Sequence, residues 1–191
     1  MLSVARKFVA INTMQELRRI TGSDDVFFEA AMEIYLHSFP ANERQSVETI
    51  RTRLDHGQYI LFTTIENSDV LGLLLLYPLV DCDFMVIDYL AINNEHRKKG
   101  IGAWLLLEVM DMVRKEYKDK YIVLETEDPE YGENRGERAA RVGFYKKLGA
   151  RKLEGVHYIL PALAGDMPTE MILMLMPGYE NDVLPGQWLN T

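Results

Sequence analysis

The sequence is poor in cysteine and in long hydrophobic runs, and it contains no internal repeat or low-complexity tract. Its single cysteine, Cys82, has no second cysteine with which to form a disulfide. The longest apolar run, residues 70–80, contains Gly72 and Pro78 and falls short of the roughly 18 residues that a transmembrane helix needs. Residues 1–7 include two basic side chains, but no apolar segment follows them, as a secretion signal would require. These absences predict a cytoplasmic protein with no membrane partner.

The sequence also lacks an excess of positive charge and any metal-ligand pattern. Its 29 acidic residues outnumber its 21 basic ones, giving a formal net charge of -8, so we expect no nucleic-acid partner. No set of histidine, cysteine and acidic residues has the spacing of metal ligands, so we expect no metal. With 191 residues, of which 48% are hydrophobic, the chain can bury one core. We expect one domain, residues 1–176, followed by a C-terminal tail, residues 177–191.

Hydrophobic periodicity predicts a mixed sheet flanked by helices, which is an α/β architecture. Four segments show the helical spacing of three and four residues, and the others are β-rich runs bounded by turn residues. Ser23 and Asp24 are expected to cap the first helix, and Pro40 ends it. The core stripe of the third helix is predicted to be Ile101, Leu105, Val109, Met112 and Val113. The predicted strands are residues 8–11, 59–65, 70–77, 84–92, 121–125, 156–160 and 171–175, and the predicted helices are residues 25–39, 47–56, 101–117 and 135–148.

Residues 88–103 carry the most informative pattern in the chain. A β-rich segment leads into a basic loop that contains Gly100 and Gly102 and opens a long helix. The first amides of a helix have no partner within it and lie at the positive end of its dipole, and glycine lets the backbone approach a bulky anion. The loop is therefore predicted to bind a phosphate or diphosphate, with a solvated turn as the alternative. The Walker pattern is absent, and the dinucleotide fingerprint fails because position 105 is leucine.

Two motifs in the second half of the chain together resemble those of the GNAT superfamily of N-acetyltransferases. The superfamily signature R/Q-x-x-G-x-G/A is matched by residues 97–102, and F-Y-x-x-x-G is matched by residues 144–149. The resemblance covers roughly residues 5–176. It implies a mixed, mostly antiparallel sheet of about seven strands flanked by four helices and splayed at the cofactor site. It also implies transfer of an acetyl group from acetyl-CoA directly to a primary amine, without a covalent enzyme intermediate.

The resemblance also implies which residues bind acetyl-CoA. The pyrophosphate would lie over the amides of residues 97–103, and the pantetheine arm would pair with residues 90–92, where an amide near Leu90 polarises the thioester carbonyl. Many relatives carry an asparagine at the position of Arg138, so Arg138 is expected either to reach a phosphate or to face solvent. The predicted cofactor-binding residues are Leu90, Ala91, Ile92, Arg97, Lys98, Lys99, Gly100, Ile101, Gly102, Ala103, Arg138 and Tyr145.

Three side chains are candidates for proton transfer. An alkylamine is almost fully protonated at neutral pH, so a carboxylate or a water chain must accept its proton. Asp88 and Glu125, on neighbouring predicted strands, are the candidate acceptors, and ordinary hydrogen-bonded or solvent-facing carboxylates are the alternative for each. Tyr145 resembles the tyrosine that protonates or stabilises the leaving thiolate in many relatives. Its alternative is a core-packing aromatic at a helix end.

The acceptor is left open by the sequence: a polyamine, an amino acid, an antibiotic and a protein N-terminus are all candidates. The loop 125–137 contains six acidic residues and is predicted, with Glu43, to attract a cationic amine, the alternative being a solvated polar loop. His157 and Tyr158 are candidates to line the same cleft. Two other functions stay open, namely a non-catalytic acyl-CoA-binding sensor and an acyltransferase that uses a different acyl-CoA. A monomer and a homodimer are both compatible with the sequence.

Overall fold

A computed structural model describes residues 15–118, 120–163 and 168–177. The predicted first strand, residues 8–11, and residues 178–191 of the predicted tail lie outside the described residues. In chain order, the strands are β1 (Glu16–Ile20), β2 (Ile60–Glu66), β3 (Asp69–Pro78), β4 (Phe84–Ile92), β5 (Tyr121–Glu127), β6 (Arg151–Lys152), β7 (Tyr158–Leu160) and β8 (Thr169–Leu175). The α-helices of the described part are α2 (Phe28–Ser38), α3 (Val47–Asp55), α4 (Ile101–Glu116) and α5 (Arg135–Lys147).

The eight strands form one mixed sheet in the order β1-β2-β3-β4-β5-β8-β6, with β7 also paired to β8. Every pairing is antiparallel except that of β4 with β5, which is parallel. Asn67 and Ser68 both have positive φ angles, as a tight hairpin between β2 and β3 requires. The predicted hairpin and the mostly antiparallel mixed sheet are therefore confirmed, with eight strands instead of about seven.

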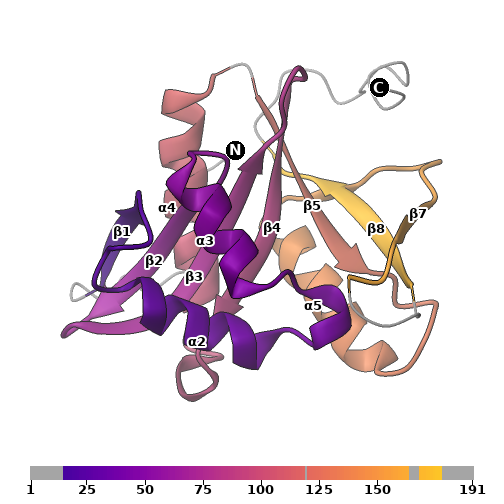
Figure 1. The fold of residues 1–191 in the computed structure, drawn as a ribbon. Coiled ribbons are helices and arrows are strands. Elements are labelled where there is room, and N and C mark those ends of the chain that lie inside the picture. The colour runs from indigo at the N-terminus through magenta and orange to yellow at the C-terminus, as the bar shows by residue number, and fades with distance from the viewer. Residues whose placement is uncertain (1–14, 119, 164–167, 178–191) are drawn as a thin grey trace.

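Two helices cover each face of the sheet (Figure 1). α2 and α3 pack on one face around Phe28, Tyr35 and Ile50, whereas α4 and α5 pack on the other around Leu105 and Tyr145. Each layer buries one apolar stripe of its helices against the sheet, so the domain has two hydrophobic cores with the sheet between them. Among the described residues, none of the helices combines the length and the apolar character that crossing a bilayer would need.

Two sequence-based details of the helices are wrong. α2 begins at Phe28 without a side-chain cap, and the Ser23 hydroxyl donates instead to Asp55, 2.8 Å away at the end of α3. The Ser23 hydroxyl is five residues from the start of α2, too far to cap that helix, and it donates to a charged carboxylate instead. Met112 is 37% exposed, because the buried stripe of α4 turns toward Leu106 and Met110.

The sheet opens between β4 and β5, which fixes the place of the site. The two strands pair only from Phe84 to Ile87 on β4 and from Tyr121 to Leu124 on β5. Beyond this point β5 continues along β8, and no described strand pairs with residues 88–92 on the side of β5. The predicted splay is thereby confirmed, and it leaves backbone N–H and C=O groups of β4 without strand partners.

Candidate active site

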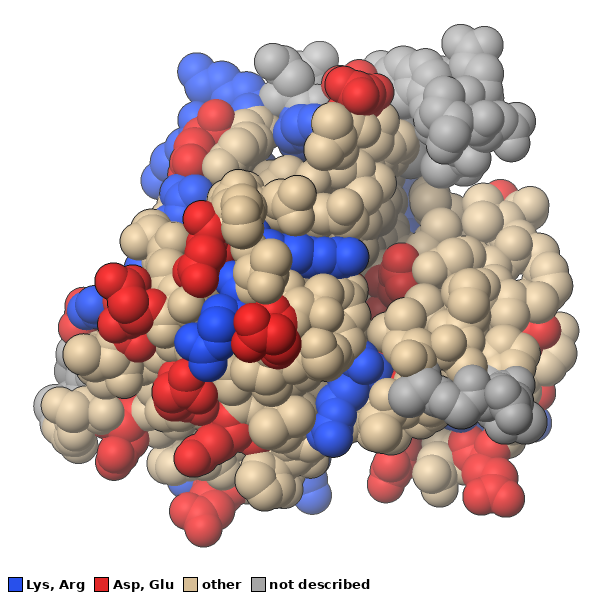
Figure 2. Space-filling model, viewed as in Figure 1, with Lys and Arg blue, Asp and Glu red and all other residues tan. Residues whose placement is uncertain are grey.

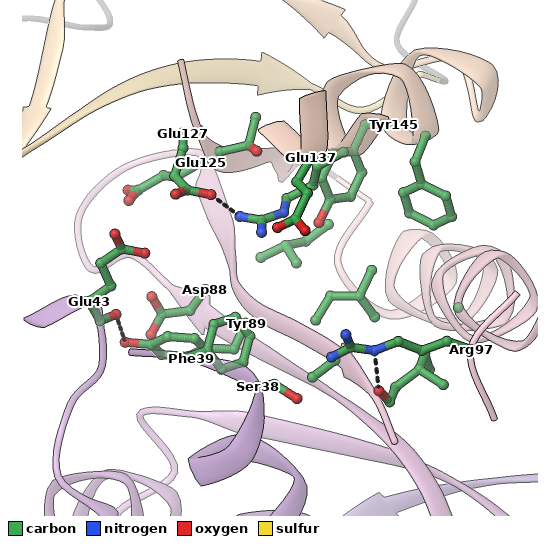
Figure 3. A pocket seen from close by; sticks show the side chains of 18 of the residues that line it. Ser38, Phe39, Glu43, Asp88, Tyr89, Arg97, Glu125, Glu127, Glu137 and Tyr145 are labelled. Carbon is green, nitrogen blue, oxygen red and sulfur yellow. Dashed lines mark hydrogen bonds and ion pairs between the residues drawn. The ribbon is translucent and has the colours of Figure 1, made fainter. Parts of the chain in front are cut away.

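A cleft of about 920 Å3 opens where β4 and β5 diverge. In the space-filling view the surface is hollowed between the part that carries β4 and the part that carries β5 and β8 (Figure 2). Within the cleft, the carboxylates of Glu43, Asp88, Glu125 and Glu127 gather on one side and Arg97 lies on the other (Figure 3). The cleft thus has an acidic part, on the side of α2 and α3, and a basic part, at the start of α4.

A β-bulge at Asp88 decides which side chains face each part. Leu75 pairs with Tyr89 and Leu76 with Ile87, so Asp88 is the extra residue on β4. Asp88 and Tyr89 consequently both face α2 and α3, although they are consecutive. After the bulge, the side chains of β4 alternate between the two faces of the sheet in the opposite order. Leu90 and Ile92 therefore pack against the α4 and α5 core. One strand therefore supplies a carboxylate to one side of the cleft and an apolar wall to the other.

The basic part of the cleft has the features of a phosphate cradle. Gly100 caps α4 with a φ angle of +83°, a left-handed conformation that favours glycine, and Lys98 is also left-handed. The first backbone bond of the helix runs from Trp104 N to Gly100 O, so the amides of residues 101–103 have no acceptor within it. A side chain at Gly102 would come within 3.3 Å of Ile92, which explains the second glycine.

Cations frame these amides. The Arg97 Nε donates to the Ile92 carbonyl oxygen at 3.1 Å, which holds the guanidinium beside the end of β4. Arg97 and Lys98 line the cleft, whereas Lys99 is exposed and lies outside its lining. Free amides, flanking cations and the unpaired edge of residues 90–92 fit a diphosphate with an extended arm, which is the shape of acetyl-CoA.

Asp88 is held by a hydrogen-bond hub centred on Tyr59. The Tyr59 hydroxyl donates to Asp88 Oδ2 at 2.6 Å and accepts from Arg53 at 3.0 Å and from Gln45 at 2.8 Å. Burial raises the pKa of Asp88, while the Tyr59 hydrogen bond and the Arg53 charge partly oppose that rise. The hub therefore fixes the orientation of a carboxylate whose charge is only partly compensated.

Glu125 is the carboxylate best suited to exchange a proton at neutral pH. Burial raises the pKa of Glu125 to about 7, helped by the charge of Asp88 and opposed by a hydrogen bond from Tyr158. A base works best when its pKa is close to the working pH. The charge of Asp88 thus adds to the burial that raises the pKa of Glu125, so the two carboxylates are electrostatically coupled.

Tyr145 lies between the acidic and basic parts of the cleft. It belongs to α5, is 7% exposed and packs against Phe144 with ring centroids 5.1 Å apart. Burial raises the pKa of Tyr145 to about 12, although the Arg141 charge opposes the rise. The hydroxyl points into the cavity (Figure 3) and is protonated at neutral pH, so it is available as a hydrogen-bond donor.

Several predicted residues lie elsewhere. Arg138 faces Glu127 at 3.2 Å, donates to the Tyr131 carbonyl oxygen at 2.7 Å and is not part of the cleft lining. His157 is largely exposed and pairs with Glu170 at 3.1 Å, whereas the adjacent Tyr158 does line the cleft. Within the acidic loop, residues 128 and 130 lie outside the lining.

Sequence reasoning missed the residues that support the acidic part of the cleft. Gln45, Arg53 and Tyr59 come from the first half of the chain and meet Asp88 only in the folded protein. Arg141 was also missed, although it pairs with Glu127. No sequence spacing predicts these contacts, because the residues lie on different helices, strands and loops and meet only through tertiary packing.

Comparison with known proteins gives a consistent picture. The sequence model of the acetyltransferase (GNAT) family matches residues 28–150. A GNAT-family protein from Bacteroides thetaiotaomicron superposes with a TM-score of 0.68 at 24% identity, over 86% of this chain and 88% of that one. A GNAT family acetyltransferase from Elizabethkingia anophelis with acetyl-CoA bound superposes with a TM-score of 0.58 at 19% identity, over 85% and 97% of the two chains.

An aminoglycoside 6'-N-acetyltransferase complexed with coenzyme A has a TM-score of 0.63 at 16% identity, over 87% of this chain and 99% of its own. At these identities the similarity shows a shared fold. No curated protein matches the sequence of this chain.

Proposed function

The chain belongs to the acetyltransferase (GNAT) family, and from that premise we propose that it transfers the acetyl group of acetyl-CoA directly to a primary amine. It is an acyltransferase, and acetyl-CoA is its co-substrate. The single observation that supports an amine acceptor is the half-buried pair Asp88 and Glu125, which lies on the side of the cleft opposite Arg97 and in which the pKa of Glu125 is near neutrality. A carboxylate poised in this way suits removal of a proton from an ammonium group.

The binding residues follow from the geometry of the cradle. The amides of residues 101–103, with Arg97, Lys98 and Gly100, hold the diphosphate, and the free edge of residues 90–92 pairs with the pantetheine arm. The exposed Lys99 adds positive charge near the cradle without lining the cleft. We assign Arg138 to Glu127 and to the loop that follows β5, not to a phosphate of CoA.

Acetyl-CoA supplies the thioester carbonyl that the amine attacks. Glu125 takes one proton from the ammonium group and passes it to solvent, and it takes the second proton from the nitrogen as the amide forms. Burial, together with the charge of Asp88, keeps the Glu125 carboxylate basic. A new C–N bond forms as the C–S bond breaks, and the electron pair of that bond leaves on sulfur. The Tyr145 hydroxyl donates a hydrogen bond to this sulfur, and the Leu90 amide donates to the carbonyl oxygen. Because a tyrosine with a pKa of about 12 gives up its proton reluctantly, stabilisation of the thiolate is favoured over full proton transfer.

The test is release of CoA, followed with a thiol reagent, from acetyl-CoA and a panel of primary amines. Glu125→Gln is expected to lower kcat by about 100-fold, the usual contribution of a general base. Tyr145→Phe is expected to lower kcat by at least about tenfold and to leave the acetyl-CoA Kd unchanged. Glu154→Gln, an exposed carboxylate outside the cleft, is the matched control. Amine-independent release, or full activity of Glu125→Gln, would contradict the proposal.

A further inference from the structure

The charges on the acidic side of the cleft do not balance. Glu127 is paired with both Arg138 and Arg141. Within the described part of the chain, Glu43, Asp88 and Glu125 take part in no ion pair. Three carboxylates without an ion-pair partner therefore face one cavity, and only the more distant charges of Arg53, Arg138 and Arg141 partly offset two of them.

The partners of these three carboxylates are neutral hydroxyl groups. Thr169 donates to Glu43 at 3.3 Å and Tyr59 donates to Asp88 at 2.6 Å, while a Tyr158 hydrogen bond reaches Glu125. Burial raises the pKa of all three carboxylates, and neighbouring acidic groups add to the rise for Glu43 and Glu125. The charges of Arg138 and Arg141 oppose the rise at Glu43, and that of Arg53 opposes it at Asp88, but burial outweighs them. A bound cation would relieve this cost, because it brings an opposite charge into direct contact with the carboxylates.

A second, independent feature of the acidic part of the cleft is a side-chain oxygen that lacks a hydrogen-bond donor. The side-chain oxygen of Gln45 is buried and has no hydrogen-bond partner, although Gln45 lines the cleft and its amide nitrogen is committed to Tyr59. A buried acceptor without a donor costs about 1–3 kcal/mol. This oxygen is fully covered in the structure, so a ligand N–H can supply the missing donor only when the Gln45 amide turns toward the cleft. The rings of Phe39 and Tyr89 also line this side of the cleft and meet edge to face, with their centroids 4.9 Å apart.

An apolar surface completes the same cavity. Leu160, Leu163 and Met171 line the cleft together with the acidic residues. The Leu163 amide donates to the Asn42 carbonyl oxygen at 2.9 Å, which ties this surface to the short 3₁₀ turn Ala41–Glu43 that carries Glu43. Carboxylates combined with an aliphatic wall suit a ligand in which methylene groups connect cationic ends.

We propose that the acceptor is an aliphatic diamine or polyamine, whose reacting amine lies at Asp88 and Glu125 and whose second ammonium binds Glu43 and, when the Gln45 amide turns toward the cleft, the oxygen of that amide. The inference rests on the proposed function and narrows its acceptor. Glu43 is then a residue that determines specificity and takes no part in the chemical step. Its contribution belongs in KM, since a remote charge contact is the same in the ground state and the transition state.

The experiment compares amines that differ only in the second charge. Putrescine is matched with n-pentylamine, and cadaverine with n-hexylamine, so that a methyl group replaces one ammonium group at equal chain length. For the full-length protein we expect, in at least one of the two pairs, a kcat/KM at least about tenfold higher for the diamine than for its monoamine, mainly through a lower KM. Glu43→Gln should lower the diamine value at least about fivefold more than the monoamine value, so that most of that advantage is lost. Glu154→Gln should leave both values unchanged, and an unaltered acetyl-CoA Kd verifies that the Glu43 variant is folded.

The outcomes separate the inference from the function on which it rests. Equal kcat/KM values within both pairs, or an equal loss for both members in Glu43→Gln, would overturn the diamine assignment and leave amine acetylation intact. If acetyl-CoA binds but neither diamines nor monoamines nor any other amine of the panel is acetylated, the proposed function fails as well. A diamine advantage that disappears in Glu43→Gln supports both.

Discussion

The charge of Asp88 is one of the causes that bring the pKa of Glu125 to about 7, burial being the larger. The two residues lie just beyond the last paired residues of β4 and β5, so no backbone pairing between these strands fixes their separation. The Tyr59 hydroxyl donates a hydrogen bond of 2.6 Å to Asp88 Oδ2 and so fixes the orientation of this carboxylate. A protein that merely needed a stable core would not place two half-buried carboxylates in one cleft, and this arrangement is typical of sites that exchange protons.

Asp88→Asn tests which of the two carboxylates accepts the proton. With Glu125 as the acceptor, kcat/KM of the wild type should fall as the pH drops below about 7, because protonated Glu125 cannot accept a proton. The substitution removes a like charge, so this acid limb should move to lower pH while kcat falls less than about tenfold. The measurement is a pH profile of kcat/KM at constant ionic strength. An unmoved limb, or a loss of about 100-fold in kcat, would instead make Asp88 the proton acceptor.

At the scale of elements, how well a segment could be predicted depends on how local its cause is. β4 was predicted with its observed bounds and α4 within one residue, because strand composition, glycines and the apolar stripe are written in consecutive residues. β1 was missed since its sequence Glu-Leu-Arg-Arg-Ile alternates poorly, and β6 contains only two residues. These edge strands form because β2 and β8 offer unpaired backbone, which no local pattern records.

The same distinction separates the two parts of the cleft. The phosphate cradle is built from consecutive residues at the start of α4, so a short sequence motif predicts it. The acidic part joins Glu43, Asp88 and Glu125 from three separate elements, and its support from Gln45 and Tyr59 follows from tertiary packing. The β-bulge at Asp88 also has no sequence signal, although it sets the facing of every later residue on β4.

The start of α4 should carry most of the affinity for acetyl-CoA. Reversing the charges of Arg97 and Lys98 to glutamate places two anions beside a bound diphosphate, and each charge-assisted contact contributes about 1.5–3 kcal/mol. We expect the acetyl-CoA Kd, measured by calorimetry, to rise by at least about 30-fold and to depend less on salt. Lys152→Glu, an exposed substitution on β6, is the control and should leave the Kd unchanged. An unaltered Kd in the double variant would remove the cradle from the proposed site.

For the whole molecule, the sheet consists of two parts that are joined by the short parallel pairing of β4 with β5. The site occupies the opening beyond that pairing, with the helices α4 and α5 on one side and α2 and α3 on the other (Figure 1). Two substrates can therefore approach the same opening from opposite faces. The cost is a set of half-buried carboxylates without ion-pair partners at the point where the sheet is least continuous.

This cost predicts that a variant lacking the proton acceptor is more stable than the wild type. Since folding raises the pKa of Glu125 from 4.5 to about 7, the unfolded chain ionises this group more readily than the folded protein does. The resulting destabilisation is absent below about pH 4.5, grows as the pH rises and is complete above about pH 7. Glu125→Gln removes it, so at pH 8 the variant should unfold about 6–12 °C higher, because a pKa raised from 4.5 to about 7 corresponds to roughly 3 kcal/mol in a domain of this size. At pH 4.5 the two melting temperatures should coincide, and Glu154→Gln should match the wild type at both pH values. A lower melting temperature of Glu125→Gln at pH 8 would mean that the folded protein stabilises the ionised carboxylate, which is incompatible with its role as a proton acceptor near neutral pH.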